Sequence, residues 1–148
     1  MNKCYIASPF FNKEQLDTVT EIEKALDNSG INYFSPRSEG VLIEMTDEER
    51  ENKFKNIYNS NILHMEECNT MIAVIDDWDT GVCVEIGYYI KSAKAIFTYS
   101  ANNYGLNVMV RQGVTSHNTK INNIITNIKQ YIDCKSITIF DELTKKVT

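Results

Sequence analysis

Four carboxylates gather in the stretch from Asn69 to Tyr89. Asp76, Asp77 and Asp79 follow an apolar run, and Glu85 comes six residues after Asp79, among valines and an isoleucine. This order predicts a buried parallel strand, an acidic loop and a helix, with the loop at the edge of the sheet where ligands bind. There Asp79 can accept hydrogen bonds from a ligand's hydroxyl groups. Glu85, held on a helix, can attack a carbon atom as a nucleophile.

Both carboxylates also have a purely structural interpretation. Asp79 can cap the helix, with or without a role in catalysis, and Glu85 can be a solvated surface residue. The apolar neighbours of Glu85 favour an inward position instead. The N-terminus of the helix favours a nearby anion, so we expect it to help keep Glu85 ionised.

These residues resemble the signature of the nucleoside 2-deoxyribosyltransferase family. The central pattern, D-x-x-D-x-G-x-x-x-E-x-G-Y, is made by Asp76, Asp79, Gly81, Glu85, Gly87 and Tyr88. Three flanking stretches agree in order and spacing: CYIASPFF at Cys4–Phe11, FSPRSE at Phe34–Glu39 and NVMVRQG at Asn107–Gly113. Together they span roughly three quarters of the chain. The resemblance implies a pentosyltransferase of nucleotide salvage that exchanges the base of a 2'-deoxynucleoside through a covalent deoxyribosyl-glutamate.

The resemblance also implies a catalytic group of Glu85, Tyr5 and Asp79. In it Glu85 is the nucleophile, and the Tyr5 hydroxyl lies against the glutamate and orients it. Tyr5 can alternatively be part of the core and nothing more. Asn107 and Met109 are implied to reach into the pocket of a neighbouring subunit, where the asparagine binds a sugar hydroxyl. We therefore expect a homo-oligomer with shared active sites.

Asn61 is expected to face the substrate. It falls on the apolar stripe of a helix predicted for Thr46–Cys68, so it points inward and needs a partner. Many members of the resembling family have aspartate here, which can supply a proton or a hydrogen bond to the departing base. Because asparagine can only hydrogen-bond, the group that protonates the base is left unassigned.

Further substrate-binding residues are expected in the loops: Phe10, Phe11, Arg37, Asp76 and Trp78. Phe10 and Phe11 can stack on a planar base or cover the edge of the sheet. Arg37 can contact a nucleobase carbonyl from the Arg37–Met45 loop, or it can pair with Glu39 at the surface. Trp78 and the two phenylalanines, with Met109, can supply apolar walls that keep water from the ester.

The fold expected around these residues is α/β: a doubly wound, flavodoxin- or Rossmann-like, mostly parallel sheet of about five strands flanked by helices. Strands are predicted for Lys3–Ser8, Ile31–Ser35, Met71–Ile75, Lys94–Tyr99 and Ser136–Phe140. Helices are predicted for Lys13–Ser29, Thr46–Cys68, the segment after Thr80 and His117–Ile132, with a short helix or loop at Leu106–Gln112. The chain of 148 residues is expected to form a single domain.

Composition excludes several classes of protein. The net charge is -5 and no lysine or arginine cluster exists, which argues against a nucleic-acid partner. No run is long and apolar enough for a membrane span, and Met1–Lys13 lacks a secretory signal, so we expect a cytoplasmic protein. Four cysteines without C-x-x-C spacing indicate buried, reduced thiols. Two distant histidines, His64 and His117, do not suggest a metal site, and no cofactor is expected.

Two other functions compete with base exchange. One is hydrolysis by a deoxynucleoside 5'-monophosphate N-glycosidase, a related family that binds phosphate with serines at the positions of Asp79 and Asn107. A carboxylate at Asp79 repels a phosphate dianion but accepts a 5'-hydroxyl, so the unphosphorylated nucleoside is favoured. The other is a non-catalytic nucleotide-sensing module, which fold alone does not exclude. The preference for purines or pyrimidines and the oligomer size stay open.

Overall fold

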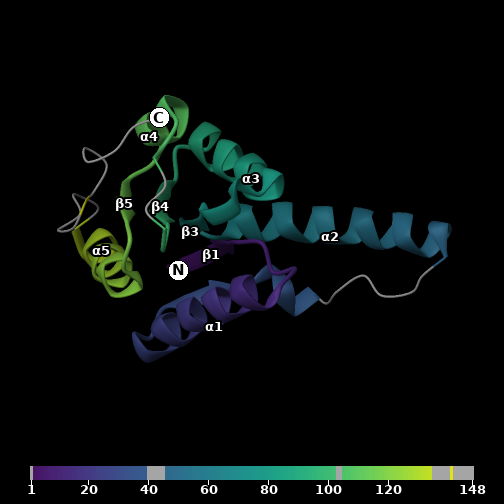
Figure 1. Ribbon diagram of the computed structural model, residues 1–148, viewed down its shortest axis with the longest axis horizontal. Coiled ribbons are helices and arrows are strands. Elements are labelled where there is room, and N and C mark those ends of the chain that lie inside the picture. Colours follow the sequence, from purple (N-terminus) through teal and green to yellow (C-terminus); the bar gives the residue numbers. More distant parts are fainter. Residues whose placement is uncertain (1, 40–45, 103–104, 135–140, 142–148) are drawn as a thin grey trace.

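A computed structural model describes residues 2–39, 46–102, 105–134 and 141. In this part of the chain five strands form one sheet in the order β2-β1-β3-β4-β5, and every neighbouring pair is parallel (Figure 1). The strands are β1 (Lys3–Ala7), β2 (Asn32–Phe34), β3 (Thr70–Val74), β4 (Ala95–Tyr99) and β5 (Ser116–Asn118). The doubly wound α/β fold expected from the sequence is confirmed.

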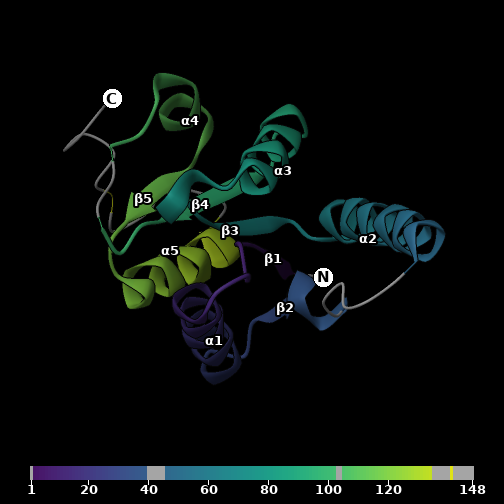
Figure 2. The same cartoon turned by 45° about the vertical axis from the view of Figure 1, so that its right-hand side comes forward.

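Helices cover both faces of the sheet. They are α1 (Lys13–Asn28), α2 (Asp47–Glu67), α3 (Thr80–Lys91), α4 (Val108–Gly113) and α5 (Ile121–Cys134), with short 3-10 turns at Pro36–Glu39 and Asp76–Trp78. Figure 2 shows α1 and α5 together on one side of the sheet and α3 on the other. Thr46 and Glu49 form a capping box at the start of α2. Among the helices described, none combines the length and apolar character needed to span a bilayer.

Alternation along the strands divides the core into two parts. In β1, Tyr5 and Ala7 join the cluster packed under α2 and α3, whereas Cys4 and Ile6 join the cluster under α1 and α5. The same alternation holds in β3, whose residues are all buried. A helix-bearing layer on each face requires strands that are apolar on both sides. Tyr5 is thereby directed toward the face that carries α3.

The order of the strands changes direction between β1 and β3. After β1 the chain crosses to β2 on one side, and after α2 it returns to β3 on the other side of β1. The two strands pair directly, with Ala7 opposite Ala73 near their carboxyl ends. Open α/β sheets bind ligands at such a switch point. The loops after β1 and β3 therefore begin side by side at the edge where a site is expected.

The fifth strand differs from the expectation. Ser116–Asn118 forms β5 and pairs with β4, so the helix predicted for His117–Ile132 was wrong in its first residues. The strand is polar and gives no apolar alternation, but its buried side chains have polar partners. His117 Nδ1 lies 2.9 Å from Thr98 Oγ1, and Asn127 Nδ2 donates to Ser116 Oγ at 3.3 Å. The strand predicted for 136–140 lies outside the described residues.

The cysteines are only partly as expected. All four are free thiols; Cys4 and Cys68 are buried, but Cys83 and Cys134 are exposed. Cys83 is exposed because it does not fall on the buried stripe of α3, which consists of Val82, Ile86 and Tyr89. The prediction of buried thiols was wrong for these two positions.

Lys94 closes the C-terminal end of α2 from the turn before β4. Its Nζ donates to the carbonyl oxygens of Met65, Glu66 and Cys68, each at 2.8 Å. These carbonyls lack partners within the helix, and a cation also suits the negative end of the helix dipole. Lys94→Met keeps the aliphatic stem but removes the donor, so we expect the free energy of unfolding to fall by about 2 kcal/mol.

Urea unfolding measures this loss. Lys24 is an exposed lysine of α1, and Lys24→Met is the matched control, with an expected change within about 0.5 kcal/mol. Equal unfolding midpoints for the two variants would show that the three carbonyls do not depend on the ammonium.

Candidate active site

A cavity of about 470 Å³ lies at the switch point. The loop after β1, the start of the first 3-10 turn, the middle of α2 and the first turns of α3 contribute its walls. The lining residues are Ser8, Pro9, Phe10, Phe11, Pro36, Phe54, Ile57, Asn61, Asp79, Gly81 and Glu85. The structure thus brings together five residues that the sequence singles out: Phe10, Phe11, Asn61, Asp79 and Glu85.

Glu85 lies in the second turn of α3 and points into the cavity. Its Oε2 is buried and makes no hydrogen bond with any described residue. Burial raises the pKa of Glu85 to about 7; Tyr5 acts in the opposite direction and the negative charge of Asp79 raises the pKa further. Burial therefore outweighs the favourable helix N-terminus, on which the sequence-based expectation of an ionised carboxylate rested. The result is a carboxylate oxygen that accepts no hydrogen bond from the described residues, as attack on carbon requires.

Tyr5 lies close enough to Glu85 for the two side chains to interact. The side chain is fully buried, and its ring lies 5.7 Å from that of Phe34 and 6.4 Å from that of Tyr89. Burial and the neighbouring Glu85 carboxylate both raise the pKa of Tyr5, so the phenol keeps its proton. The hydroxyl interacts with Glu85 but reaches no hydrogen bond of normal geometry within the part of the chain described. A small movement of either side chain would let the O–H donate to the carboxylate.

Asp79 has two roles in the geometry. As the N-cap of α3 it accepts a hydrogen bond from Val82 N at 3.1 Å, and it also lines the cavity. The cap allowed by the sequence is therefore present. Gly81 leaves room for this carboxylate, because a Cβ added at Gly81 would lie only 2.9 Å from Asp79 Oδ2.

Gly81→Ala is expected to displace the Asp79 carboxylate. Losing the cap costs about 1 kcal/mol, and the better helix propensity of alanine offsets about the same amount, so the melting temperature should barely change. Turnover of the site's substrate should fall about tenfold, since a displaced side chain no longer positions the ligand. Parallel measurement of kcat/KM and melting temperature separates the two effects.

Gly87→Ala is the matched control in the same helix. Nothing lies within 4 Å of a Cβ added there. We expect wild-type turnover and a gain of about 0.5–1 kcal/mol in stability. If both alanine variants turned over like the wild type, the position of Asp79 would not depend on Gly81.

Asn61 projects from α2 into the cavity as expected. Its Oδ1 is buried and accepts no hydrogen bond from any residue described. A buried amide oxygen without a partner is costly, and a ligand that donates to it would relieve the cost. Phe54 and Ile57, at positions i and i+3 of the same helix face, were not predicted as site residues. Their spacing relative to Asn61 is the signal that could have identified them.

Asp76 and Trp78 do not line the cavity. The Asp76 carboxylate accepts hydrogen bonds from Ser100 Oγ at 2.7 Å and Ala101 N at 2.9 Å, which ties the loop after β3 to the loop after β4. Trp78 packs against the core cluster below α3. Neither side chain therefore belongs to the walls of the described cavity, and their contacts with substrate stay a prediction.

Arg37 does not pair with Glu39, and it is not among the residues that line the described cavity. Its guanidinium forms a two-pronged ion pair with Glu23 of α1, and its Nη1 also donates to Thr20 Oγ1 at 3.1 Å. Glu39 accepts instead from Ser60 Oγ at 3.1 Å. The pairing was missed because Glu23 lies in a different element, and periodicity does not report such contacts. Residues 40–45 of the Arg37–Met45 loop lie outside the described residues.

Asn107 and Met109 lie apart from the cavity of their own chain. Asn107 caps α4 and accepts from Met109 N at 2.9 Å, while Met109 is 75% exposed. Phe10 and Phe11 do line the cavity, with ring centroids 5.3 Å apart. Phe11 is 72% exposed, so one apolar wall is open on its outer side.

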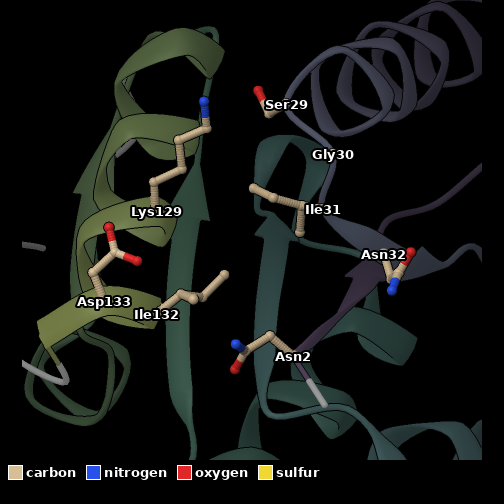
Figure 3. A pocket seen from close by; sticks show the side chains of 8 residues that line it. All are labelled: Asn2, Ser29, Gly30, Ile31, Asn32, Lys129, Ile132 and Asp133. Carbon is tan, nitrogen blue, oxygen red and sulfur yellow. The ribbon is translucent and has the colours of Figure 1, made fainter.

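A second hollow of about 340 Å³ lies at the opposite ends of the strands, between α1 and α5 (Figure 3). Its lining residues are Asn2, Ser29, Gly30, Ile31, Asn32, Lys129, Ile132 and Asp133. No site residue expected from the sequence is among them. The described part of the chain also holds no cluster of three potential metal ligands. The cavity around Glu85 is therefore the candidate active site.

Comparison with known proteins agrees with the motifs. A family model described as nucleoside 2-deoxyribosyltransferase matches residues 4–123. A 2-deoxyribosyltransferase from Bacillus psychrosaccharolyticus is 26% identical, with 99% of this chain and 97% of that chain covered and a TM-score of 0.68. No match was found among curated proteins.

Two further solved structures share the fold. A 2-desoxiribosyltransferase from Leishmania mexicana is 20% identical, with 78% of this chain and 73% of that chain covered and a TM-score of 0.53. A CMP N-glycosidase from Clostridium botulinum is 12% identical, with 88% of this chain and 100% of that chain covered and a TM-score of 0.52.

Proposed function

The chain belongs to the nucleoside 2-deoxyribosyltransferase family, and from this premise we propose that it exchanges the base of a 2'-deoxynucleoside through a covalent ester on Glu85. The observation that carries the proposal is the buried Glu85 oxygen, which has no protein partner among the described residues and borders a cavity with apolar walls. The neighbouring Tyr5 hydroxyl and the Asp79 carboxylate support it.

In the first step a Glu85 carboxylate oxygen forms a bond to C1' of the sugar. The bond from C1' to the base nitrogen breaks, and its electron pair leaves with the base. Asn61 can hold the departing base by hydrogen bonds, but it has no proton to give. Because a 2'-deoxy sugar lacks the electron-withdrawing hydroxyl next to C1', positive charge develops there more easily, which favours deoxyribosides as substrates.

In the second step a nitrogen of a new base attacks C1' from the vacated side. The ester bond breaks and Glu85 regains its electron pair. The new base releases its N–H proton to the solvent, which balances the proton that the departed base takes up from the solvent. Two displacements at one carbon retain its configuration and require ping-pong kinetics. The apolar residues Phe10, Phe54 and Ile57 line the cavity and can limit the access of water to the ester.

The proposed enzyme is a homo-oligomer with shared active sites. Asn107 and Met109 lie outside their own cavity, and the methionine is largely exposed. This is the placement needed if, as the family resemblance implies, they complete the pocket of a neighbour. The oligomer would then be required for catalysis as well as for assembly.

Hydrolysis of a deoxynucleoside 5'-monophosphate is the competing function. The fold shared with a CMP N-glycosidase is compatible with it. Asp79 argues against it, because its carboxylate lines the cavity and would repel a phosphate dianion. The unphosphorylated nucleoside is therefore the better candidate.

Resolving reaction products distinguishes these functions. The enzyme is incubated with deoxyinosine and adenine, with deoxyinosine monophosphate and adenine, or with thymidine and adenine to cover a pyrimidine donor. Base exchange predicts deoxyadenosine from a nucleoside donor and no consumption of the monophosphate. If the monophosphate released its base even when adenine is left out of the incubation, the enzyme would instead be a hydrolase. No turnover of any donor would favour a sensor.

A further inference from the structure

One side chain of α1 joins two loops that both contribute residues to the cavity. Gln15 Oε1 accepts a hydrogen bond from Phe11 N at 2.9 Å, and Gln15 Nε2 donates to Asp77 Oδ2 at 3.2 Å. The backbone N–H of Phe11 can only donate and the Asp77 carboxylate can only accept, so a single orientation of the Gln15 amide satisfies both. Gln15 thus bridges the loop after β1 and the loop after β3.

The position of Gln15 on α1 explains its reach. Asn12 is the N-cap and accepts from Gln15 N at 2.9 Å, so Gln15 is the third residue of the helix. Side chains at this position commonly turn back toward the backbone before the helix. Gln15 does so and uses its second polar atom to contact a segment 62 residues away.

The loop after β3, which Gln15 contacts, has a backbone conformation that such a segment would rarely adopt on its own. Asp77 and Trp78 have φ angles of 70° and 46°, in the left-handed region that residues with a Cβ usually avoid. Such a conformation persists only where surrounding contacts fix it. Asp76 is bonded to the loop after β4 on one side, and Asp77 to Gln15 on the other.

This loop ends at Asp79, which begins the helix that carries Glu85. The other loop carries Phe10 and Phe11, which also line the cavity. We propose that Gln15 is a positioning residue that fixes the spacing between these two loops, so that a substrate resting on the loop after β1 meets Glu85 at bonding distance. Gln15 does not itself line the cavity among the residues described. The effect on turnover rests on the proposed function; the coupling of the loops does not.

The test reverses the polarity of one hydrogen bond. Gln15→Glu keeps the acceptor for Phe11 N but replaces the donor to Asp77 by a carboxylate that repels it. We expect kcat to fall about tenfold, since small displacements of positioning groups have effects of this size. KM should change less, because the substrate contacts themselves remain. Hydrogen exchange of the backbone amides of Phe11 and of Asp77 to Asp79 should quicken.

Adding Asp77→Asn to Gln15→Glu restores a donor and an acceptor in exchanged places. Asparagine also tolerates the left-handed backbone at 77. We expect this double variant to regain kcat to within about twofold of wild type. Asp77→Asn alone keeps an acceptor for Gln15 and is the matched control, with near wild-type kcat and exchange.

Wild-type kcat and unchanged exchange in Gln15→Glu would overturn the proposal, as would a double variant no better than Gln15→Glu. An inactive wild type would remove the proposed function alone, because the exchange rates still decide whether Gln15 couples the loops.

Discussion

Replacing Glu85 by glutamine is expected to abolish base exchange and, above pH 7, to make the protein more stable. Glutamine has nearly the same shape but cannot form the ester, so kcat should fall at least about 10⁴-fold. The same change removes a buried negative charge whose Oε2 no described residue compensates with a hydrogen bond. A variant that gains stability but loses turnover is expected where the original side chain serves catalysis at the expense of stability.

The gain in stability depends on pH in a defined direction. The pKa of Glu85 is about 7 in the folded protein and 4.5 without the protein's influence. At a pH between these two pKa values, the Glu85 carboxyl is protonated in the folded protein but ionised in the unfolded chain. The stability of the wild type therefore falls as the pH rises through this range. Above pH 7 the ionised Glu85 lowers the free energy of unfolding by its full amount, about 3 kcal/mol from the difference between the two pKa values. At pH 5.5 less than half of this loss in stability should remain.

Calorimetric melting at pH 8 and pH 5.5, together with the exchange assay, measures both effects. Glu51→Gln, at an exposed position of α2, is the matched control and should change neither turnover nor the pH dependence of melting. Turnover retained by Glu85→Gln would exclude Glu85 as the nucleophile. A melting temperature unchanged at pH 8 would mean that the carboxylate is solvated.

Tyr5→Phe is expected to lower activity with little effect on stability. The ring packing against Phe34 and Tyr89 is kept, and a buried hydroxyl without a normal hydrogen bond in the described chain is removed. Tyr5 lowers the pKa of Glu85, so without it the pKa should rise above 7. We expect kcat/KM at pH 7 to fall about 10- to 100-fold, from lost orientation and lost ionisation together.

A pH profile separates these two contributions. In wild type kcat/KM should rise with pH through about 7 as Glu85 ionises. In Tyr5→Phe the rise should occur at higher pH and recover part of the loss. A profile unshifted from wild type would show that the hydroxyl does not act on Glu85.

Tyr89→Phe is the matched control for Tyr5→Phe. The Tyr89 hydroxyl donates to the carbonyl oxygens of Cys68 and Thr70, at 3.3 Å each. Its loss should lower the free energy of unfolding by about 1 kcal/mol and leave kcat/KM nearly unchanged. The two tyrosines are therefore expected to show opposite patterns, one affecting turnover and the other stability.

The sequence predicts the parts of this site that follow from periodicity. The apolar runs give four of the five strands in the structure, and helical spacing places Asn61 inward on α2. The acidic loop after a buried strand locates the edge of the sheet where the cavity lies. Position along the chain is sufficient for these inferences because each depends only on neighbours within one element.

Contacts between distant elements could not be predicted in this way. Arg37 pairs with Glu23 in a different element, and Gln15 bridges two loops that are far apart in sequence. The polar strand β5 lacks apolar alternation and depends on buried partners such as Thr98 and Asn127. The raised pKa of Glu85 depends on burial, which emerges only when α3 packs against β1. All of these are properties of packing rather than of local pattern.

Intact-protein mass spectrometry of the enzyme mixed with a deoxynucleoside, and no acceptor base, tests the central claim most directly. The account predicts a mass increase of one deoxyribosyl group, located by peptide mapping on Glu85 and discharged when a second base is added. An adduct on another residue, or the absence of any adduct on an enzyme that exchanges bases rapidly, would contradict it.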